Sequence, residues 1–488
     1  MGEEVVRDVG SNSVEFNSQS AVVDSSPKSP FGQITSPMKK AFASMQSHLE
    51  EVGHFTKLDP QDDWLPITES RNGNAYHSAF HTLSSGIGFQ ALLLPYAFTT
   101  LGWVWGIICL SLIFTWQLYT LWLLIHLHES ESGIRYSRYL RLSMAAFGEK
   151  LGKVLALFPI MYLSGGTCVA LIMTSGETIK IFFQIVCGET PLTTIEWYVL
   201  FTCTAIVIAQ LPNLNSIAGV SLIGALSGIT YCTLLWLLSV IHGRPNSVSY
   251  DPPGDVLSMP TLNALGIVVF AFRGHNLVLE IQGTMPSSAH HPSRVPMWRG
   301  VKLAYLIIAI CIFPLAIAGY WAYGNLIPAN GGMLNALYYY HKNDTSKLLI
   351  ALTSLLLVIN CLSTFQIYAM PVFDNLESRF TSKWKRPCPR WLRSTIRAFF
   401  GCLAFLIAVA LPFLPSLAGL LGGIALPITL AYPSFMWINL KKPHKYGSNW
   451  CLNWALGILG MIISILVVAG AIWSIVLIGL PIHFFKPL

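Results

Sequence analysis

The sequence predicts an all-α integral membrane protein with eleven transmembrane helices. Hydrophobic residues make up 53% of the chain and charged residues only 11%, whereas about 25% of residues are charged in soluble proteins. From residue 75 onward, apolar runs reach the length of about 20 residues that a helix needs to cross a bilayer. The predicted spans are 75–99, 102–127, 153–186, 195–212, 216–241, 261–284, 300–324, 346–373, 393–411, 413–438 and 451–480.

The first 70 residues differ from the rest, because they are polar and contain no apolar run that could span a membrane. We expect residues 1–70 to form a mostly disordered cytoplasmic tail and residues 71–488 to form the transmembrane domain. Three Ser-Pro pairs begin at Ser26, Ser29 and Ser36. They are either part of a flexible tail or a target for a proline-directed kinase and a phospho-reader.

The first span is interrupted at its centre by glycine. The stretch AYHSAFHTLSSGIGFQALLLPYAF holds, in succession, Ser84, Ser85, Gly86, Ile87 and Gly88. Glycine lowers helix stability by about 1 kcal/mol relative to alanine, and an unbonded backbone group costs several kcal/mol in lipid. Two glycines here indicate either close packing at a helix crossing or a backbone that holds a ligand. The N–H groups at the start of the second half-helix would suit a carboxylate.

The sixth span is interrupted in a matching way. The stretch TLNALGIVVFAFRGHNLVLEIQGTM holds Arg273, Gly274, His275 and Asn276 at its centre and Glu280 beyond. Ionisable groups inside a membrane are expensive and usually functional. Arg273 stays charged at any accessible pH, so it must face water, a substrate carboxylate, or a carboxylate such as Glu280 or Glu177. Glu280 is the first candidate for exchanging a coupling proton, and His275 the second. Interrupted helices in both halves of a chain are typical of a transporter's binding site.

Two other spans carry polar side chains. Glu177 and Lys180 are spaced to form an ion pair on one helix face of the third span. In the eighth span, Ser363 and Thr364 offer oxygens either to a cation opposite the first break or to neighbouring helices. We interpret these four residues as candidates for a cation site or for gating.

The positive charges test the number and direction of the spans. With a cytoplasmic amino terminus, 24 of the 30 Lys and Arg residues fall on the inner side and four on the outer side, as the positive-inside rule requires. The net charge of +7 therefore reflects orientation and anionic lipid rather than nucleic-acid binding. An odd number of spans places the carboxyl terminus outside. The sequon at Asn343 falls in a predicted outer loop, which makes Asn343 a candidate for glycosylation.

Five strings carry a family resemblance: NAYHSAFHTLSSGIGFQALLLPYAFTTLGW, YTLWLLIHLHE, AAFGEKLG, FRGHNLVLEIQGTMPSS and FQIYAMPVFDNLES. With them, the chain from about residue 60 to its end resembles the plant amino acid/auxin permease family, in its lysine/histidine transporter-like branch. The resemblance implies a LeuT-like fold of two inverted five-helix repeats, about 75–241 and 261–438, and an eleventh helix, about 451–480. It also implies that the amino-acid site is lined by Ser85, Gly86, Ile87, Gly88, Gly274, His275 and Asn276.

One departure concerns selectivity. The branch typically has a small residue, alone or after an aromatic one, ahead of Gly-His-Asn, and this chain has Phe272 and Arg273. An arginine there would repel cationic amino acids and favour neutral or acidic ones, unless a carboxylate neutralises it. The branch name therefore does not predict lysine and histidine as substrates.

The resemblance implies a proton-coupled symporter that imports amino acids across the plasma membrane by alternating access. Two other functions stay open: an importer of auxin-like indole acids, and an amino-acid sensor without net transport. An enzyme is not expected, because no nucleophile–base or metal-ligand spacing stands out. We expect no cofactor and no metal, and we expect the partners to be the amino acid, the proton and the bilayer.

Overall fold

The computed structural model describes residues 60–131, 133–251, 258–288, 290–410 and 414–478. In these residues the chain is helical, and its β-structure is limited to one isolated bridge between Glu129 and Arg135. The predicted all-α class is confirmed. The expectations for the Ser-Pro pairs and for the carboxyl end lie outside the described residues.

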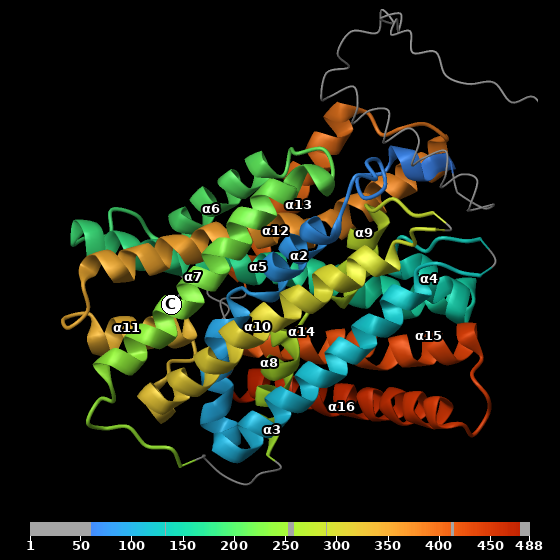
Figure 1. Cartoon of the computed structure of the whole chain (residues 1–488). Helices are drawn as coiled ribbons and strands as arrows, with labels where there is room; N and C mark the ends of the chain where they lie inside the picture. The colour runs from blue at the N-terminus through green and yellow to red at the C-terminus, as the bar shows by residue number, and fades with distance from the viewer. Residues whose placement is uncertain (1–59, 132, 252–257, 289, 411–413, 479–488) are drawn as a thin grey trace, which may run out of the picture. The chain divides into compact units, whose positions relative to one another are not determined.

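The chain is built from helices of widely different length (Figure 1). The α-helices are α2 (Ala75–Gly86), α3 (Gln90–Leu127), α4 (Tyr139–Phe147), α5 (Glu149–Cys187), α6 (Thr194–Ile208), α7 (Ala218–His242), α8 (Met259–Ala271), α9 (His275–Gly283), α10 (Arg294–Tyr323), α11 (Gly332–His341), α12 (Lys347–Trp384), α13 (Arg390–Ala410), α14 (Leu414–Leu426), α15 (Tyr432–Lys441) and α16 (Ser448–Ile478). In the described part of the chain, nine helices or helix pairs are long and apolar enough to cross a membrane. The count of eleven stays a prediction.

The first two predicted spans meet at Gly102. Helix α3 is continuous in its hydrogen bonding, but Gly102 has φ 68° and ψ −176°, which is not helical. Only glycine adopts such a conformation readily. The kink therefore divides α3 close to the predicted boundary between residues 99 and 102.

Several predicted boundaries are wrong. Helix α12 extends to Trp384, eleven residues beyond the predicted end at 373, because its last turns carry charged residues and leave the apolar window. The tenth span is interrupted by a π-helical segment, Pro427–Ala431. Helices α4 and α11 were not predicted, because each is too short to give a membrane-length apolar run.

The broken helices lie inside the bundle. Helix α2 packs on α7 and α10, α3 on α8 and α10, and α12 on α5 and α7. Helices α8 and α9, with the break between them, form the most buried of the candidate spans, at 89% of its apolar window. The two breaks are therefore shielded from lipid by surrounding helices, which is the condition for irregular backbone at membrane depth.

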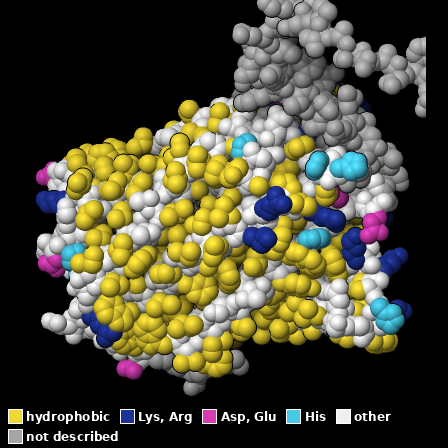
Figure 2. All heavy atoms as spheres, in the orientation of Figure 1, with side chains coloured by type: hydrophobic (Ala, Val, Ile, Leu, Met, Phe, Trp, Pro, Cys, Tyr) yellow, Lys and Arg dark blue, Asp and Glu magenta, His cyan; other side chains and the backbone are white. Residues whose placement is uncertain are grey.

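The outer surface of these helices is apolar. Figure 2 shows hydrophobic side chains over most of the visible face, with charged side chains gathered mainly near two opposite edges. Exposed large apolar side chains occur on many helices, among them Leu112, Phe158, Leu226, Ile310, Leu406 and Ile465. Such a surface suits contact with lipid tails.

A buried ion network ties the segment before α2 to α4 and α12. Arg138 Nη1 lies 2.8 Å from Asp62 Oδ1, and its Nε lies 2.5 Å from Asp374 Oδ2. Arg141 also reaches Asp62, at 3.0 Å. Burial raises the pKa of Asp62, but Arg138 and Arg141 outweigh it, so this pKa lies below its ordinary value of 3.8. The carboxylate is thus ionised at neutral pH.

We expect Asp62→Asn to destabilise the protein by about 3 kcal/mol or more, because it leaves the Arg138 charge short of one partner in a buried site. The melting temperature of the detergent-solubilised protein measures this. Asp63→Asn is the matched control, since Asp63 is the exposed neighbour. A carboxyl group whose pKa is lower in the folded protein than in the unfolded chain stabilises the fold at any pH above the unfolded-state pKa. This stabilisation is lost as the pH falls through the folded-state pKa. The difference between wild type and Asp62→Asn should therefore be the same at pH 7 and at pH 5, and a difference that shrinks over this interval would contradict the assignment.

Candidate functional site

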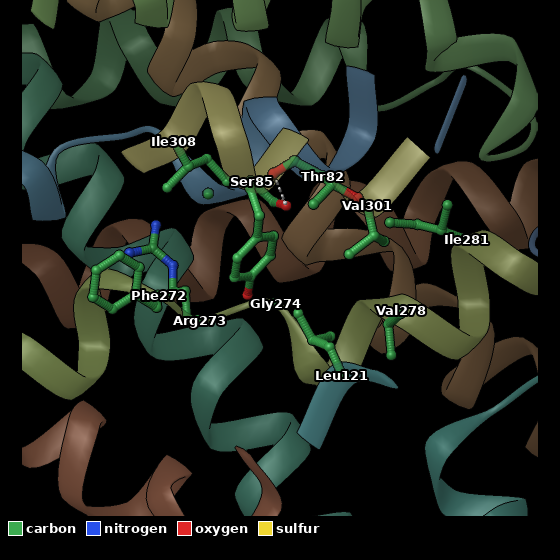
Figure 3. Close-up of a pocket in the computed structure, with 12 residues that line it drawn as sticks. Thr82, Ser85, Leu121, Phe272, Arg273, Gly274, Val278, Ile281, Val301 and Ile308 are labelled. Atoms are coloured by element: carbon green, nitrogen blue, oxygen red, sulfur yellow. Dashed lines mark hydrogen bonds between the residues drawn. The ribbon is translucent and has the colours of Figure 1, made fainter. Parts of the chain in front are cut away.

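The structure contains both predicted breaks and brings them together. Helix α2 ends at Gly86 and α3 begins at Gln90, while α8 ends at Ala271 and α9 begins at His275. Figure 3 shows Arg273 and Gly274 of one break across a cavity from Thr82 and Ser85 of the other. The cavity is lined by Thr82, Ser85, Gly86, Leu121, Phe272, Arg273, Gly274, Val278, Ile281, Val301, Tyr305 and Ile308.

This central cavity is closed in the structure. Its volume is about 20 Å³, which is room for roughly one water molecule. An amino acid needs more space, so binding here requires the surrounding helices to move apart. Ile308 is one side chain that closes the cavity, since a Cβ placed on Gly86 would lie 2.6 Å from its Cδ1.

The carbonyls that the first break releases are bonded by side chains. Thr364 Oγ1 donates to the Ser84 carbonyl at 2.7 Å, and Asn360 Nδ2 donates to the Ile87 carbonyl at 2.9 Å. Gln90 Nε2 donates to the Gly86 carbonyl at 2.8 Å. These bonds remove the cost of unpaired carbonyls at the end of a buried helix.

Ser363 joins three helices beside this break. Its Oγ lies 2.8 Å from Ser84 Oγ and donates to the Val220 carbonyl of α7 at 3.0 Å. The candidate cation-site residues Ser363 and Thr364 thus lie next to the first break. In this structure they hydrogen-bond to α2 and α7.

Unlike the carbonyl groups of the first break, its backbone N–H groups at Gly88, Phe89 and Gln90 have no acceptors among the described residues. They lie at the start of α3, where the helix dipole favours negative charge. The first break therefore offers donors to an anion and few free acceptors to a cation.

The second break is held by its polar side chains. Its Gly274 has φ 143°, a conformation that side-chain-bearing residues rarely adopt. His275 Nε2 lies 2.9 Å from Thr120 Oγ1 and 3.1 Å from the Gln117 carbonyl. Asn276 Nδ2 donates to Ser164 Oγ at 3.1 Å. His275 and Asn276 therefore anchor α9 to α3 and α5, and neither lines the central cavity.

Arg273 is buried without a counter-charge. Its side chain is 2% exposed, and none of its three guanidinium nitrogens has a hydrogen-bond acceptor among the described residues. The guanidinium carbon lies 4.4 Å from the ring centre of Phe270, 4.8 Å from Tyr368 and 5.1 Å from Phe89.

The aromatic rings compensate only part of the cost of this burial. A desolvated cation–π contact contributes about 2 kcal/mol, whereas an unpaired buried ion costs several kcal/mol and also lacks its hydrogen bonds. Of the alternatives that the sequence left open, pairing with Glu280 or Glu177 does not occur, because none of the described ion pairs includes Arg273. A charged acceptor from outside the chain would complete the site.

A second, larger cavity of about 570 Å³ lies beside the first. It is lined by Arg138, Leu140, Arg141, Met144, Glu149, Lys153, Leu157, Ile160, Met161, Glu280, Pro371, Asp374, Asn375, Ser378, Arg379, Ser382 and Lys383. Its basic residues belong to the loops that the charge count places on the inner side.

Glu280 belongs to this second cavity. It is 5% exposed, and its Oε2 has no hydrogen-bond partner among the described residues. Asp374 and Arg138 act on it electrostatically. Val278 and Ile281 of the same helix line the central cavity, so the short helix α9 separates the two cavities.

Three predicted residues lie away from both cavities. Lys180 donates to Thr194 Oγ1 at 3.2 Å, and no ion pair is formed between it and Glu177. Asn343 lies on an exposed turn after α11, which is accessible to a glycosylating enzyme. Glycosylation itself stays a prediction.

Sequence reasoning missed the residues that complete the site. In the sequence, Asn360 is one polar residue among several in the eighth span, and nothing distinguishes Gln90. The rings of Phe89, Phe270 and Tyr368 look like ordinary apolar residues of a span. Tyr368 could have been predicted to lie near the site, because it is one helical turn beyond Thr364, on the face of α12 that meets the first break.

Comparisons with known proteins agree with the arrangement. A family model described as transmembrane amino acid transporter protein matches residues 71–477. Lysine histidine transporter-like 8 of Arabidopsis thaliana is 59% identical over 94% of this chain and 89% of its own length. Lysine histidine transporter-like 7 of the same plant is 46% identical over 88% of this chain and 90% of its own length.

A solved structure supports the fold. A Na⁺-coupled sialic acid symporter, 12% identical, aligns with a TM-score of 0.54 over 89% of this chain and 96% of its own. At this identity the likeness shows the fold alone, which is the expected LeuT-like fold.

We expect Gly274→Ala to destabilise the protein by about 1 to 3 kcal/mol, because alanine is strained at φ 143°. Space is not the obstacle, since the nearest atom to an added Cβ is Ser85 Oγ at 4.0 Å. Gly165→Ala in α5 is the control, because no neighbouring atom lies within 4 Å of its added Cβ. Melting temperatures measure both. Equal melting temperatures for the two variants would show that the break tolerates a side chain.

Proposed function

The chain belongs to the transmembrane amino acid transporter family, in its lysine/histidine transporter-like branch, and we propose that it is a proton-coupled amino acid symporter. It is a multi-pass membrane protein, and we place it in the plasma membrane with its amino terminus in the cytosol and its carboxyl terminus outside. The proposal rests mainly on two helix breaks that face each other across a buried cavity.

The substrate's α-carboxylate binds the free N–H groups of Gly88, Phe89 and Gln90. Its ammonium binds carbonyls of the second break, because those of Ala271, Phe272 and Arg273 accept no hydrogen bond from the described residues. The carbonyls of the first break already have donors. The carboxylate of the zwitterion is therefore bound by the first half of the protein, and its ammonium by the second half.

Proton coupling is assigned to Glu280. Its carboxyl lines the inner cavity, from which a proton reaches it, and it lies on the short helix α9, whose Val278 and Ile281 line the central cavity. A buried carboxyl is costly when charged and unpaired, so protonation favours the closed arrangement. Proton and substrate then bias the same conformational change.

The ligands of the first break support a proton rather than a metal ion as the coupling species. Thr364 and Asn360 donate hydrogen bonds to the carbonyls of Ser84 and Ile87, which a metal ion would otherwise require as ligands. His275 is the less favoured proton carrier, because its Nε2 is engaged with Thr120 and Gln117.

The second, larger cavity, which is the inner cavity of this proposal, and the closed central cavity together support alternating access. The inner cavity opens on the side with the basic loops, and the central cavity is too small for a substrate. We infer that the structure represents an inward-facing form after substrate release.

The direct test is an uptake panel in oocytes with the twenty radiolabelled amino acids and indole-3-acetate, at an acidic and an alkaline outer pH. We expect inward currents with amino acids that vanish at alkaline outer pH. Electroneutral, pH-independent uptake would contradict proton coupling. Uptake of the indole acid alone would identify an auxin importer. Binding without flux in reconstituted vesicles would identify a sensor.

We expect Glu280→Gln to abolish accumulation against a gradient and to leave substrate exchange intact, because a glutamine cannot carry the proton. Vesicles with and without internal unlabelled substrate separate the two activities. Glu149→Gln is the matched control, since Glu149 lines the same inner cavity from the exposed start of α5. Full accumulation by Glu280→Gln would remove Glu280 from this role.

A further inference from the structure

The unpaired guanidinium of Arg273 has a consequence for the class of substrate. This argument rests on the proposed function. Arg273 lines the central cavity beside Gly274, across from Ser85 (Figure 3). Its side chain is 98% buried, and all of its nitrogen donors lack acceptors among the described residues.

The surroundings of Arg273 hold it in position without satisfying it. Three rings, those of Phe89, Phe270 and Tyr368, surround the guanidinium. Rings attract the cation through their faces, and the Tyr368 hydroxyl also interacts with the guanidinium, but none of these groups carries a negative charge to balance it. An arginine fork that is held rigidly with free donors is suited to a bidentate contact with a carboxylate.

Among the described residues, none of the carboxylates considered as partners forms an ion pair with Arg273. Glu280 faces the inner cavity, and Asp374 pairs with Arg138. Glu177 lies on α5 and does not line the central cavity. The carboxylate that completes the Arg273 site must therefore arrive with the substrate.

The α-carboxylate already has another place to bind. The free N–H groups of Gly88, Phe89 and Gln90 belong to the first break, and Arg273 belongs to the second. A substrate with one carboxylate satisfies one of these two features, and a substrate with two satisfies both. We propose that the transporter selects acidic amino acids, with the side-chain carboxylate of aspartate or glutamate bound by Arg273.

The same charge acts against other substrates. Lysine, arginine and protonated histidine would place a second positive charge next to Arg273 in a medium of low dielectric constant. Asparagine and glutamine have nearly the shape of the acids but leave the guanidinium without a counter-charge. These two amides are therefore the most informative competitors.

The experiment compares kcat/KM for uptake of aspartate and glutamate with that of asparagine and glutamine. We expect the acids to be preferred by about tenfold or more, since a buried charged group that loses its partner discriminates strongly. Arg273→Met keeps the length of the side chain and removes the charge, and it should reduce this ratio to near one. Arg273→Lys should retain part of the preference.

Arg244→Met is the matched control. Arg244 also stacks on aromatic rings, those of Tyr250 and Trp321, but it is exposed and distant from the breaks in the fold. This variant should keep the acid-to-amide ratio of the wild type. Surface expression of every variant is quantified in the same cells.

If Arg273→Met does not transport, binding to the purified protein replaces uptake. Glutamate should raise the melting temperature of the wild type more than glutamine does, and this difference should disappear in Arg273→Met. Equal uptake of acids and amides by the wild type overturns the inference, and so does an unchanged ratio in Arg273→Met. In both cases the proposed function stands, whereas a protein that moves no amino acid overturns the proposed function as well.

Discussion

A helix that is interrupted inside a bilayer must find new partners for its released backbone groups, and the rest of this structure follows from that requirement. At the first break the protein itself supplies the donors, through Thr364, Asn360 and Gln90. Among the described residues, it leaves the N–H groups of Gly88, Phe89 and Gln90 at the start of the next half-helix without acceptors. Partial satisfaction of this kind makes a rigid site that is complementary to an anion.

The charged side chains near one end of the bundle are paired, whereas Arg273 at the breaks is not. At the end of the bundle that carries the second cavity, arginines and carboxylates pair with one another, as Arg138 does with Asp62 and Asp374. At the breaks a single arginine remains, surrounded by rings and without a carboxylate. The paired charges connect the segment before α2 to α4 and α12. The unpaired arginine remains available to a ligand. A charged partner within the protein thus distinguishes the structural arginine, Arg138, from the candidate binding arginine, Arg273.

The fold could be predicted from the sequence to a large extent, because membrane helices are long and apolar and their loops carry a charge bias. Both breaks were predicted from glycine and from charged residues at mid-span. The direction in which each side chain of the second break points could not be predicted. Nothing in the order Arg273-Gly274-His275-Asn276 indicates that Arg273 lines the cavity while His275 and Asn276 point to α3 and α5. The aromatic surroundings of Arg273 come from three separate helical segments, and their meeting depends on tertiary packing.

The depth of Arg273 also determines how its field responds to the solution outside. Mobile ions screen a surface charge over about 10 Å at moderate ionic strength, but they do not enter a site that is sealed by packed side chains. With 2% of its surface exposed, this guanidinium is screened much less by salt than a surface charge while the helices are closed around it. Rim charges on a transporter attract ions more weakly as salinity rises. Discrimination that is exercised by Arg273 would therefore depend less on salinity than attraction by such rim charges.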